Sequence, residues 1–206
     1  MDKGWKGMLV YLAEWISRLA YLNLLWIGFT LLGLGVFGFM PATVSMFAIT
    51  RQWMRQPNDT PLFRSFWNYY KQEFLKSNAT GVILFLIGHV MYFDVFIFEY
   101  DESMSMQMLK FVLYILALMY ILFVVYFFPV YVQFDMKWYQ YFKISALMPF
   151  ATPLRALLMT FLGYGVFYLM SKMPILMFFF LGSSISYLWQ MIALPAFYQF
   201  KTQNER

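Results

Sequence analysis

Residues 19–50 read LAYLNLLWIGFTLLGLGVFGFMPATVSMFAIT, a stretch without a charged side chain. As a single helix these 32 residues would be about 48 Å long, whereas the apolar core of a bilayer is about 30 Å thick. Three glycines and a proline, which favour turns, lie in its middle: Gly33, Gly35, Gly38 and Pro41. The stretch therefore predicts either one span with an extension or a tight hairpin of two short helices, near residues 12 to 33 and 40 to 54.

The composition of the whole chain is that of a membrane protein. Its 206 residues are 62% hydrophobic and 12% charged, whereas a soluble domain is roughly 45–50% apolar and about 25% charged. The chain has no cysteine, which excludes a disulfide scaffold. This composition also excludes a disordered protein and a nucleic-acid binder. We therefore expect an all-α fold, a polytopic bundle of membrane helices that forms one domain over residues 1–206.

Four further stretches have the length and composition of membrane spans. They cover about residues 79 to 98, 107 to 133, 152 to 171 and 173 to 200. Basic residues prefer the cytoplasmic side, so charge decides the path of the first stretch. The hairpin places 13 of the 15 basic residues inside and leaves Lys110 and Lys172 outside, whereas a single first span gives ten inside and five outside. We predict six spans with both termini cytoplasmic, and five spans remain the alternative.

Residues 61–77 belong to the longest polar stretch and predict an amphipathic helix. Large aromatic side chains fall on one face of the helical wheel, and basic side chains fall outside it. The aromatic positions are Phe63, Phe66, Trp67, Tyr70 and Phe74, and the basic positions are Arg64 and Lys71. Such a helix suits the inner membrane surface. We expect it to lie on lipid or to dock a cytoplasmic partner, and both interpretations can hold together.

Polar side chains inside the predicted spans are functional candidates, because such groups are costly in a membrane. His89 lies in the middle of a span, where it offers a proton site, a lining for a polar path or, as we prefer, a hydrogen bond to a neighbouring helix. Asp94 lies near the outer end of the same span, where water reaches it. Asn23 is expected to bridge helices. Glu14 and Arg18 are four residues apart and are expected to form a structural pair.

The sequence contains no recognisable constellation of catalytic residues. Residues 33–38 match the letters of the GxGxxG dinucleotide fingerprint, but that fingerprint requires a preceding strand in a βαβ unit. Here the glycines lie inside an apolar stretch, so we interpret them as a turn or a close contact between helices. We therefore expect that the protein is not an enzyme, and we predict no catalytic, cofactor-binding or metal-binding residue.

Several short segments carry a family resemblance. They are YLNLLW (21–26), GFMPATVSMFA (38–48), RQW (51–53), FWNYYK (66–71) and FLKSN (74–78). In these segments, and in the closing stretch between Pro174 and Pro195, the chain resembles the YesL-like family of bacterial integral membrane proteins. The resemblance covers most of the chain and implies no catalytic residue.

The resemblance implies a role and a set of partners. It points to a multi-pass protein of the bacterial cell membrane that acts as an auxiliary component of a carbohydrate ABC import system. The implied partners are membrane lipid, the ABC permease subunits and their ATPase, with no nucleic acid. Two alternatives remain, a regulatory scaffold that links the transporter to a sensor kinase and a stand-alone transporter. Few polar side chains lie in the predicted spans, which argues against the transporter.

Overall fold

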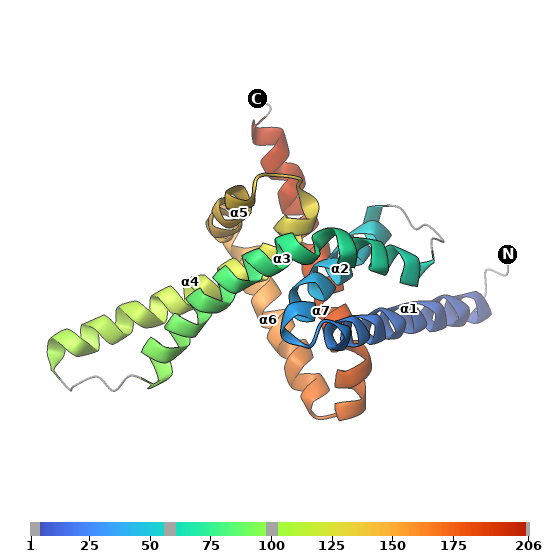
Figure 1. The fold of residues 1–206 in the computed structure, drawn as a ribbon, viewed down its shortest axis with the longest axis horizontal. Helices are drawn as coiled ribbons and strands as arrows, with labels where there is room; N and C mark the ends of the chain where they lie inside the picture. Colours follow the sequence, from blue (N-terminus) through green and yellow to red (C-terminus); the bar gives the residue numbers. More distant parts are fainter. Residues whose placement is uncertain (1–4, 56–60, 98–102, 205–206) are drawn as a thin grey trace.

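The computed structural model describes residues 5–55, 61–97 and 103–204, and these ranges are almost entirely helical. The elements in chain order are α1 (Trp5–Leu32), α2 (Val36–Arg55), α3 (Leu62–Tyr92), the π-helical turn η1 (Phe93–Ile97), α4 (Met104–Gln133), α5 (Trp138–Ala151), α6 (Pro153–Ser171) and α7 (Pro174–Asn204) (Figure 1). No strand occurs in the described ranges. The predicted all-α fold is confirmed.

The predicted hairpin is formed by α1 and α2. Leu34 and Gly35 take left-handed backbone angles, with φ of 59° and 77°, and they reverse the chain between the two helices. The N–H of Gly35 donates to the carbonyl of Thr30 at 2.9 Å and closes the end of α1. The indole N–H of Trp26 donates to the Thr43 hydroxyl at 3.0 Å, so the two helices lie side by side beyond the turn.

Five elements are long and apolar enough to cross a membrane: α1, α3 with η1, α4, α6 and α7. The second helix of the hairpin, α2, does not meet the same criterion. Every residue of α2 from Pro41 to Thr50 is buried, so protein rather than lipid surrounds this part of the helix. The sixth helix is thus present near its predicted position, while the number of apolar spans agrees with the alternative count of five.

The predicted amphipathic helix is the first half of α3. This helix runs for 31 residues from Leu62 to Tyr92, and its polar and apolar halves belong to one continuous helix (Figure 1). The segment is therefore helical as predicted, but it is not a separate element. Phe66 and Tyr70 of this first half contact Phe29 on α1, which places the first half of α3 directly beside the hairpin.

Two apolar clusters hold the bundle together. The larger cluster joins α2 with α4, α5, α6 and α7, and its large buried members include Phe47, Tyr126, Phe127, Tyr141, Met148, Met159 and Phe197. The smaller cluster joins α1 with α2 and α3 through Leu22, Leu25, Phe29, Met46, Ile49, Phe66 and Tyr70. Because α2 contributes to both clusters, it is the central helix of the structure.

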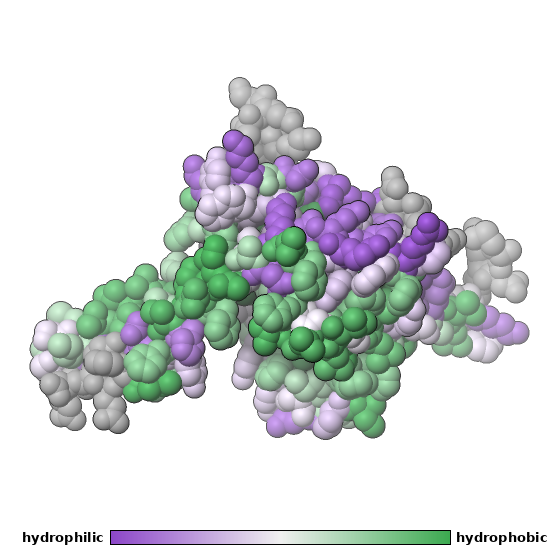
Figure 2. Space-filling model, viewed as in Figure 1, coloured by the Kyte–Doolittle hydropathy of each residue, from purple (hydrophilic) through white to green (hydrophobic). Residues whose placement is uncertain are grey.

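The surface is divided into a polar end and an apolar body. Hydrophilic side chains gather at the top of the molecule, over α5 and the first half of α3, and green apolar surface covers much of the rest of this face (Figure 2). We call this region the polar end. The second half of α3 with η1 and the first half of α4 project away from the bundle as a helix pair (Figure 1). We call residues 82–97 and 104–121 the arm.

Candidate functional site

A cavity of about 340 Å³ lies where the ends of α2 and α4 meet the middle of α3 and the start of α5. Its polar lining consists of Arg51, Tyr69, Glu73, Lys76, Tyr131, Gln133, Asp135 and Tyr141. We call it the polar pocket. No cavity in this position was predicted from the sequence, and its residues come from four elements that are distant along the chain.

Arg51 joins α2 to the end of α4. Its guanidinium donates a hydrogen bond to the backbone carbonyl of Val132, and this carbonyl is one of the last four of α4, which have no partner within the helix. A positive charge at a helix C-terminus is also electrostatically favourable. Burial, together with the nearby charge of Arg55, lowers the pKa of Arg51 from its ordinary value. The guanidinium nevertheless stays protonated at neutral pH.

Glu73 and Tyr131 connect α3 to α4 across the pocket. The Tyr131 hydroxyl donates to Oε2 of Glu73 at 2.8 Å. Tyr131 is 4% exposed, and Glu73 is partly buried. A hydrogen bond to a carboxylate is stronger than one between neutral groups, so this contact fixes the carboxylate at the pocket wall.

Lys76 is held by two aromatic rings. Its Nζ donates to the Tyr141 hydroxyl at 3.1 Å, and it lies 5.5 Å from the ring centre of Tyr131 and 4.9 Å from that of Tyr141. The two rings are stacked with their centres 4.7 Å apart. A cation over aromatic rings is stabilised by their negative faces. The ammonium group thus has aromatic and hydroxyl partners in place of a carboxylate.

Tyr141 also organises the link between α4 and α5. Its hydroxyl donates to the carbonyl of Phe134 at 3.2 Å and accepts the N–H of Met136 at 3.1 Å. Asp135 lies between these two residues and lines the pocket. The ring that contacts Lys76 therefore also positions the Asp135 backbone.

The charged side chains of the pocket do not pair with one another. Two are cationic, Arg51 and Lys76, and two are anionic, Glu73 and Asp135. Within the described part of the chain, the ion pair between Glu14 and Arg18 is the only one formed. Two further buried pocket atoms, Nε of Arg51 and Oε1 of Gln133, have no hydrogen-bond partner. The pocket therefore offers unpaired charges of both signs, an arrangement suited to binding a small polar group.

The predicted docking face of residues 61–77 requires a correction. Phe66 is fully buried and Tyr70 is 5% exposed. The ring of each lies with its centre 5.0 Å from that of Phe29 on α1, and the Tyr70 hydroxyl donates to the Phe29 carbonyl at 3.2 Å. These two side chains bind the chain's own first helix, so neither is available to lipid or to a partner.

The remaining residues of that segment differ in exposure. Phe63, Arg64, Trp67 and Lys71 are exposed, and Phe74 is partly buried. The Lys71 ammonium lies 5.1 Å from the ring centre of Trp67, one turn away on the same helix. We call the four exposed residues the aromatic–basic strip. It retains the chemistry predicted for an interfacial or docking surface.

The polar residues predicted inside the spans lie in different environments. His89 lies on the exposed face of α3 with its ring centre 5.8 Å from that of Phe85, and its imidazole forms no hydrogen bond with any residue in the described ranges. The expected bond from His89 to a neighbouring helix is therefore not formed there. Asp94 lies in η1 and is partly exposed. Neither residue lines the polar pocket.

Asn23 bridges two helices, as predicted. It is 1% exposed, its amide nitrogen donates to the Phe178 carbonyl at 2.6 Å, and its amide oxygen accepts the N–H of Ser183 at 3.1 Å. Both partners belong to α7. The first and last helices are therefore fastened by one buried side chain.

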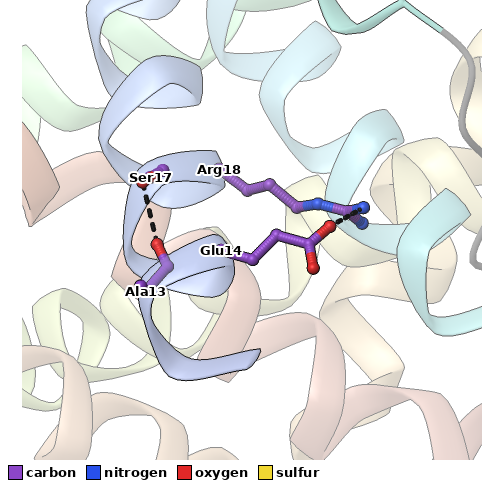
Figure 3. Close-up of polar contacts among 4 residues, drawn as sticks. All are labelled: Ala13, Glu14, Ser17 and Arg18. Atoms are coloured by element: carbon purple, nitrogen blue, oxygen red, sulfur yellow. Dashed lines mark hydrogen bonds and ion pairs between the residues drawn. The ribbon is translucent and has the colours of Figure 1, made fainter. Parts of the chain in front are cut away.

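The predicted pair on α1 is also confirmed. Figure 3 shows Arg18 and Glu14 one turn apart on the same side of the helix, with an N–O distance of 2.6 Å. Half of the Glu14 side chain is exposed, and Arg18 is 31% exposed. A surface pair of this kind contributes little to stability.

Comparisons with known proteins place the chain in a family. The profile of the family described as "Protein of unknown function, DUF624" matches residues 19–95, from the hairpin to η1. Three proteins of Bacillus subtilis (strain 168) are similar over most of their length. "Uncharacterized protein YteU" is 40% identical over 88% of this chain and 81% of its own, and "Uncharacterized protein YesL" is 34% identical over 95% and 92%. "Uncharacterized protein YesV" is 33% identical over 94% and 93%.

No solved structure matches this chain. The matches with YteU, YesL and YesV cover 88%, 95% and 94% of this chain. The residues that carry the resemblance lie on α1, α2, α3 and α7. This chain therefore belongs to the YesL-like family of membrane proteins.

Proposed function

We propose that this protein is an auxiliary integral-membrane component of a carbohydrate ABC import system, in which it assists permease assembly or coupling. The carbohydrate link rests on the family resemblance. The structural observation that supports an auxiliary role is the arm, because its two helices leave the bundle and expose large apolar side chains. Those more than half exposed include Val82, Phe85, Leu86, Val90, Phe96, Met108 and Phe111. Transmembrane helices of another subunit can pack laterally against such a pair of exposed apolar helices.

The aromatic–basic strip supports a second contact outside the lipid. It lies on the first half of α3, near the polar end, and combines Phe63 and Trp67 with Arg64 and Lys71. Aromatic and arginine side chains are enriched in protein interfaces. We propose that the polar end and both termini lie in the bacterial cytoplasm, as the distribution of basic residues predicts. The strip would then face the inner surface of the membrane, within reach of the transporter's ATPase.

Site-specific cross-linking in native membranes tests this proposal. A photoreactive residue replaces Phe111 on the arm, and a matched one replaces Phe161 on α6; the two side chains are 66% and 73% exposed. We expect Phe111 to cross-link to an ABC permease subunit and Phe161 to lipid alone. Cross-links to lipid alone from both positions, with no permease recovered on purification, would overturn the proposal.

The cross-linking experiment and a transport assay together distinguish the alternatives. Recovery of a sensor kinase in place of a permease would assign the protein to a regulatory scaffold. Sugar uptake by vesicles that contain only the purified protein would assign it to stand-alone transport. Either result would exclude an auxiliary subunit as the primary role.

A further inference from the structure

We propose that the polar pocket binds the headgroup of phosphatidylethanolamine, with its phosphate on Arg51 and Lys76 and its ammonium on Glu73 and Asp135. This inference concerns a lipid ligand and is independent of any link to carbohydrate import. It rests on the charges of the pocket, on its size and position, and on the way its aromatic rings are already occupied.

The charged side chains of the pocket favour a ligand that carries both a positive and a negative charge. The pocket holds two cationic and two anionic side chains, and none of them forms a direct ion pair with another, although Glu73 and Asp135 both attract the Lys76 ammonium. A purely anionic ligand would meet Glu73 and Asp135, and a purely cationic ligand would meet Arg51 and Lys76, so each would be repelled by half of the site. A zwitterion of zero net charge satisfies both halves. The unpartnered Nε of Arg51 supplies one further donor for a phosphate oxygen.

The size and the position of the pocket fit a lipid headgroup. Its volume of about 340 Å³ lies within the range of about 300–1,000 Å³ that is typical of small-molecule sites. The pocket lies where α4 ends, at the boundary between an apolar span and the polar link to α5. Headgroups occupy this depth in a bilayer. Ala48 and Val44 line the pocket one and two turns before Arg51 and form its apolar inner wall.

The aromatic rings favour ethanolamine over choline. A choline group is recognised by open aromatic faces. Of the four aromatic residues that line the pocket, Tyr131 and Tyr141 are occupied by each other and by Lys76, which leaves Tyr69 and Phe134. A primary ammonium instead donates hydrogen bonds to carboxylates, whereas a quaternary ammonium has no hydrogen to donate. Glu73 and Asp135 therefore select the primary ammonium.

Native mass spectrometry of the full-length protein tests the proposal. The protein is purified in detergent and mixed with phosphatidylethanolamine, phosphatidylcholine and phosphatidylglycerol that carry identical acyl chains. We expect phosphatidylethanolamine to be retained about tenfold or more over the other two, the ratio expected for one charge-assisted hydrogen bond. Equal retention of all three lipids by the wild-type protein would overturn the proposal.

Three variants assign the effect to the pocket. Glu73→Gln keeps an acceptor for the Tyr131 hydroxyl. This variant should no longer prefer phosphatidylethanolamine over phosphatidylglycerol. Asp135→Asn should weaken the same preference without touching that hydrogen bond, because Asp135 is an exposed residue outside the helices. Lys172→Gln, exposed at the turn between α6 and α7, is the matched control and should retain the wild-type preference. An unchanged preference in both pocket variants would overturn the assignment.

A competition separates the lipid from a soluble zwitterion with the same headgroup. Excess phosphoethanolamine is added to the complex of the wild-type protein with phosphatidylethanolamine. We expect the lipid to remain bound, since its acyl chains add apolar contacts that the free headgroup lacks. Displacement of the lipid would identify a soluble ligand and overturn the assignment to a membrane lipid.

Discussion

Tyr131, near the end of α4, donates its hydroxyl hydrogen to Glu73 on α3 at 2.8 Å. The two residues are 58 positions apart along the chain, and their contact closes one wall of the polar pocket. The ring of Tyr131 also stacks on Tyr141 and contacts Lys76. A single side chain thus connects α3, α4 and α5 at the point where the apolar spans end.

The hydroxyl of Tyr131 should contribute measurably to stability. Tyr131→Phe removes one hydrogen bond to a partly buried carboxylate, and we expect the free energy of unfolding to fall by about 1–3 kcal/mol. Denaturant unfolding in detergent micelles measures the change. Tyr114→Phe, at an exposed position of the arm, is the control and should be neutral. Equal stabilities of the two variants would show that the contact with Glu73 is energetically unimportant.

The hairpin should tolerate an added methyl group at Gly28 and should not tolerate one at Gly38. A Cβ at Gly38 would overlap the carbonyl oxygens of Phe29 and Thr30, whereas a Cβ at Gly28 meets no atom within 4 Å. Gly38→Ala should therefore reduce folded protein strongly, because backbone must move. Gly28→Ala should be neutral or stabilising by up to about 1 kcal/mol, since alanine is the better helix former.

Size-exclusion profiles and thermal unfolding of the two glycine variants provide the measurement. Gly33→Ala is a second test of the same contact, because its Cβ would overlap the backbone of Gly38. A well-folded Gly38→Ala variant with wild-type stability would contradict the tight packing of the turn.

Asn23 should hold α1 against α7. Asn23→Ala removes hydrogen bonds to the Phe178 carbonyl and the Ser183 N–H, and we expect a loss of about 1–2 kcal/mol in the free energy of unfolding. Asn68→Ala, at an exposed position of α3, should change stability little. If both variants unfold alike, the two helices are held by apolar packing alone.

The two sides of the first half of α3 should give different phenotypes. Phe66→Ala empties a fully buried site against Phe29, so it should cost about 3–5 kcal/mol of stability. Phe63 and Trp67 also contact the Phe29 ring, but they are 53% and 37% exposed. Replacing both by serine should therefore cost less stability than Phe66→Ala and should weaken partner recovery from native membranes. Stability and co-purification are measured on the same preparations. Full partner recovery by the Phe63 and Trp67 variant would exclude the aromatic–basic strip as a docking surface.

The path of the chain through the membrane should place both termini on one side. We use a reporter that is active only in the cytoplasm. Because α2 returns beside α1, this reporter should be active both when it is fused before Asp2 and when it is fused after Arg206. A reporter fusion at Lys172, between α6 and α7, should show the opposite pattern. An external N-terminal reporter would refute the hairpin path in the membrane.

Much of the fold follows from the sequence, because lipid imposes strict rules on it. A chain with 62% hydrophobic residues must satisfy its backbone hydrogen bonds within helices when it crosses a bilayer. The glycines in residues 33–38 predicted the turn, since an uninterrupted helix would exceed the membrane thickness. The polar side chain of Asn23 predicted a contact between helices, because an amide in an apolar span needs a partner. These inferences depend on local composition and spacing, and the structure confirms them.

The candidate site could not be found in this way. Glu73 and Lys76 lie on the helix predicted from residues 61–77, and Arg51 belongs to a segment that carried the family resemblance, but nothing in their spacing shows that they meet Tyr131 and Tyr141. The only signal was the concentration of charged and aromatic side chains near the ends of several predicted helices. That composition is common at membrane boundaries, so it does not identify a pocket.

The sequence by itself determined the class of the protein and the approximate positions of most apolar helices, and it favoured the hairpin, because hydropathy and backbone preferences act over short distances along the chain. Only the tertiary structure decided that Phe66 and Tyr70 face α1 instead of lipid, and that α2 lies inside the bundle. It also decided that four unpaired charges surround one cavity at the polar end. Those features depend on which helices pack together, and packing is a property of contacts between segments that the sequence separates by tens of residues.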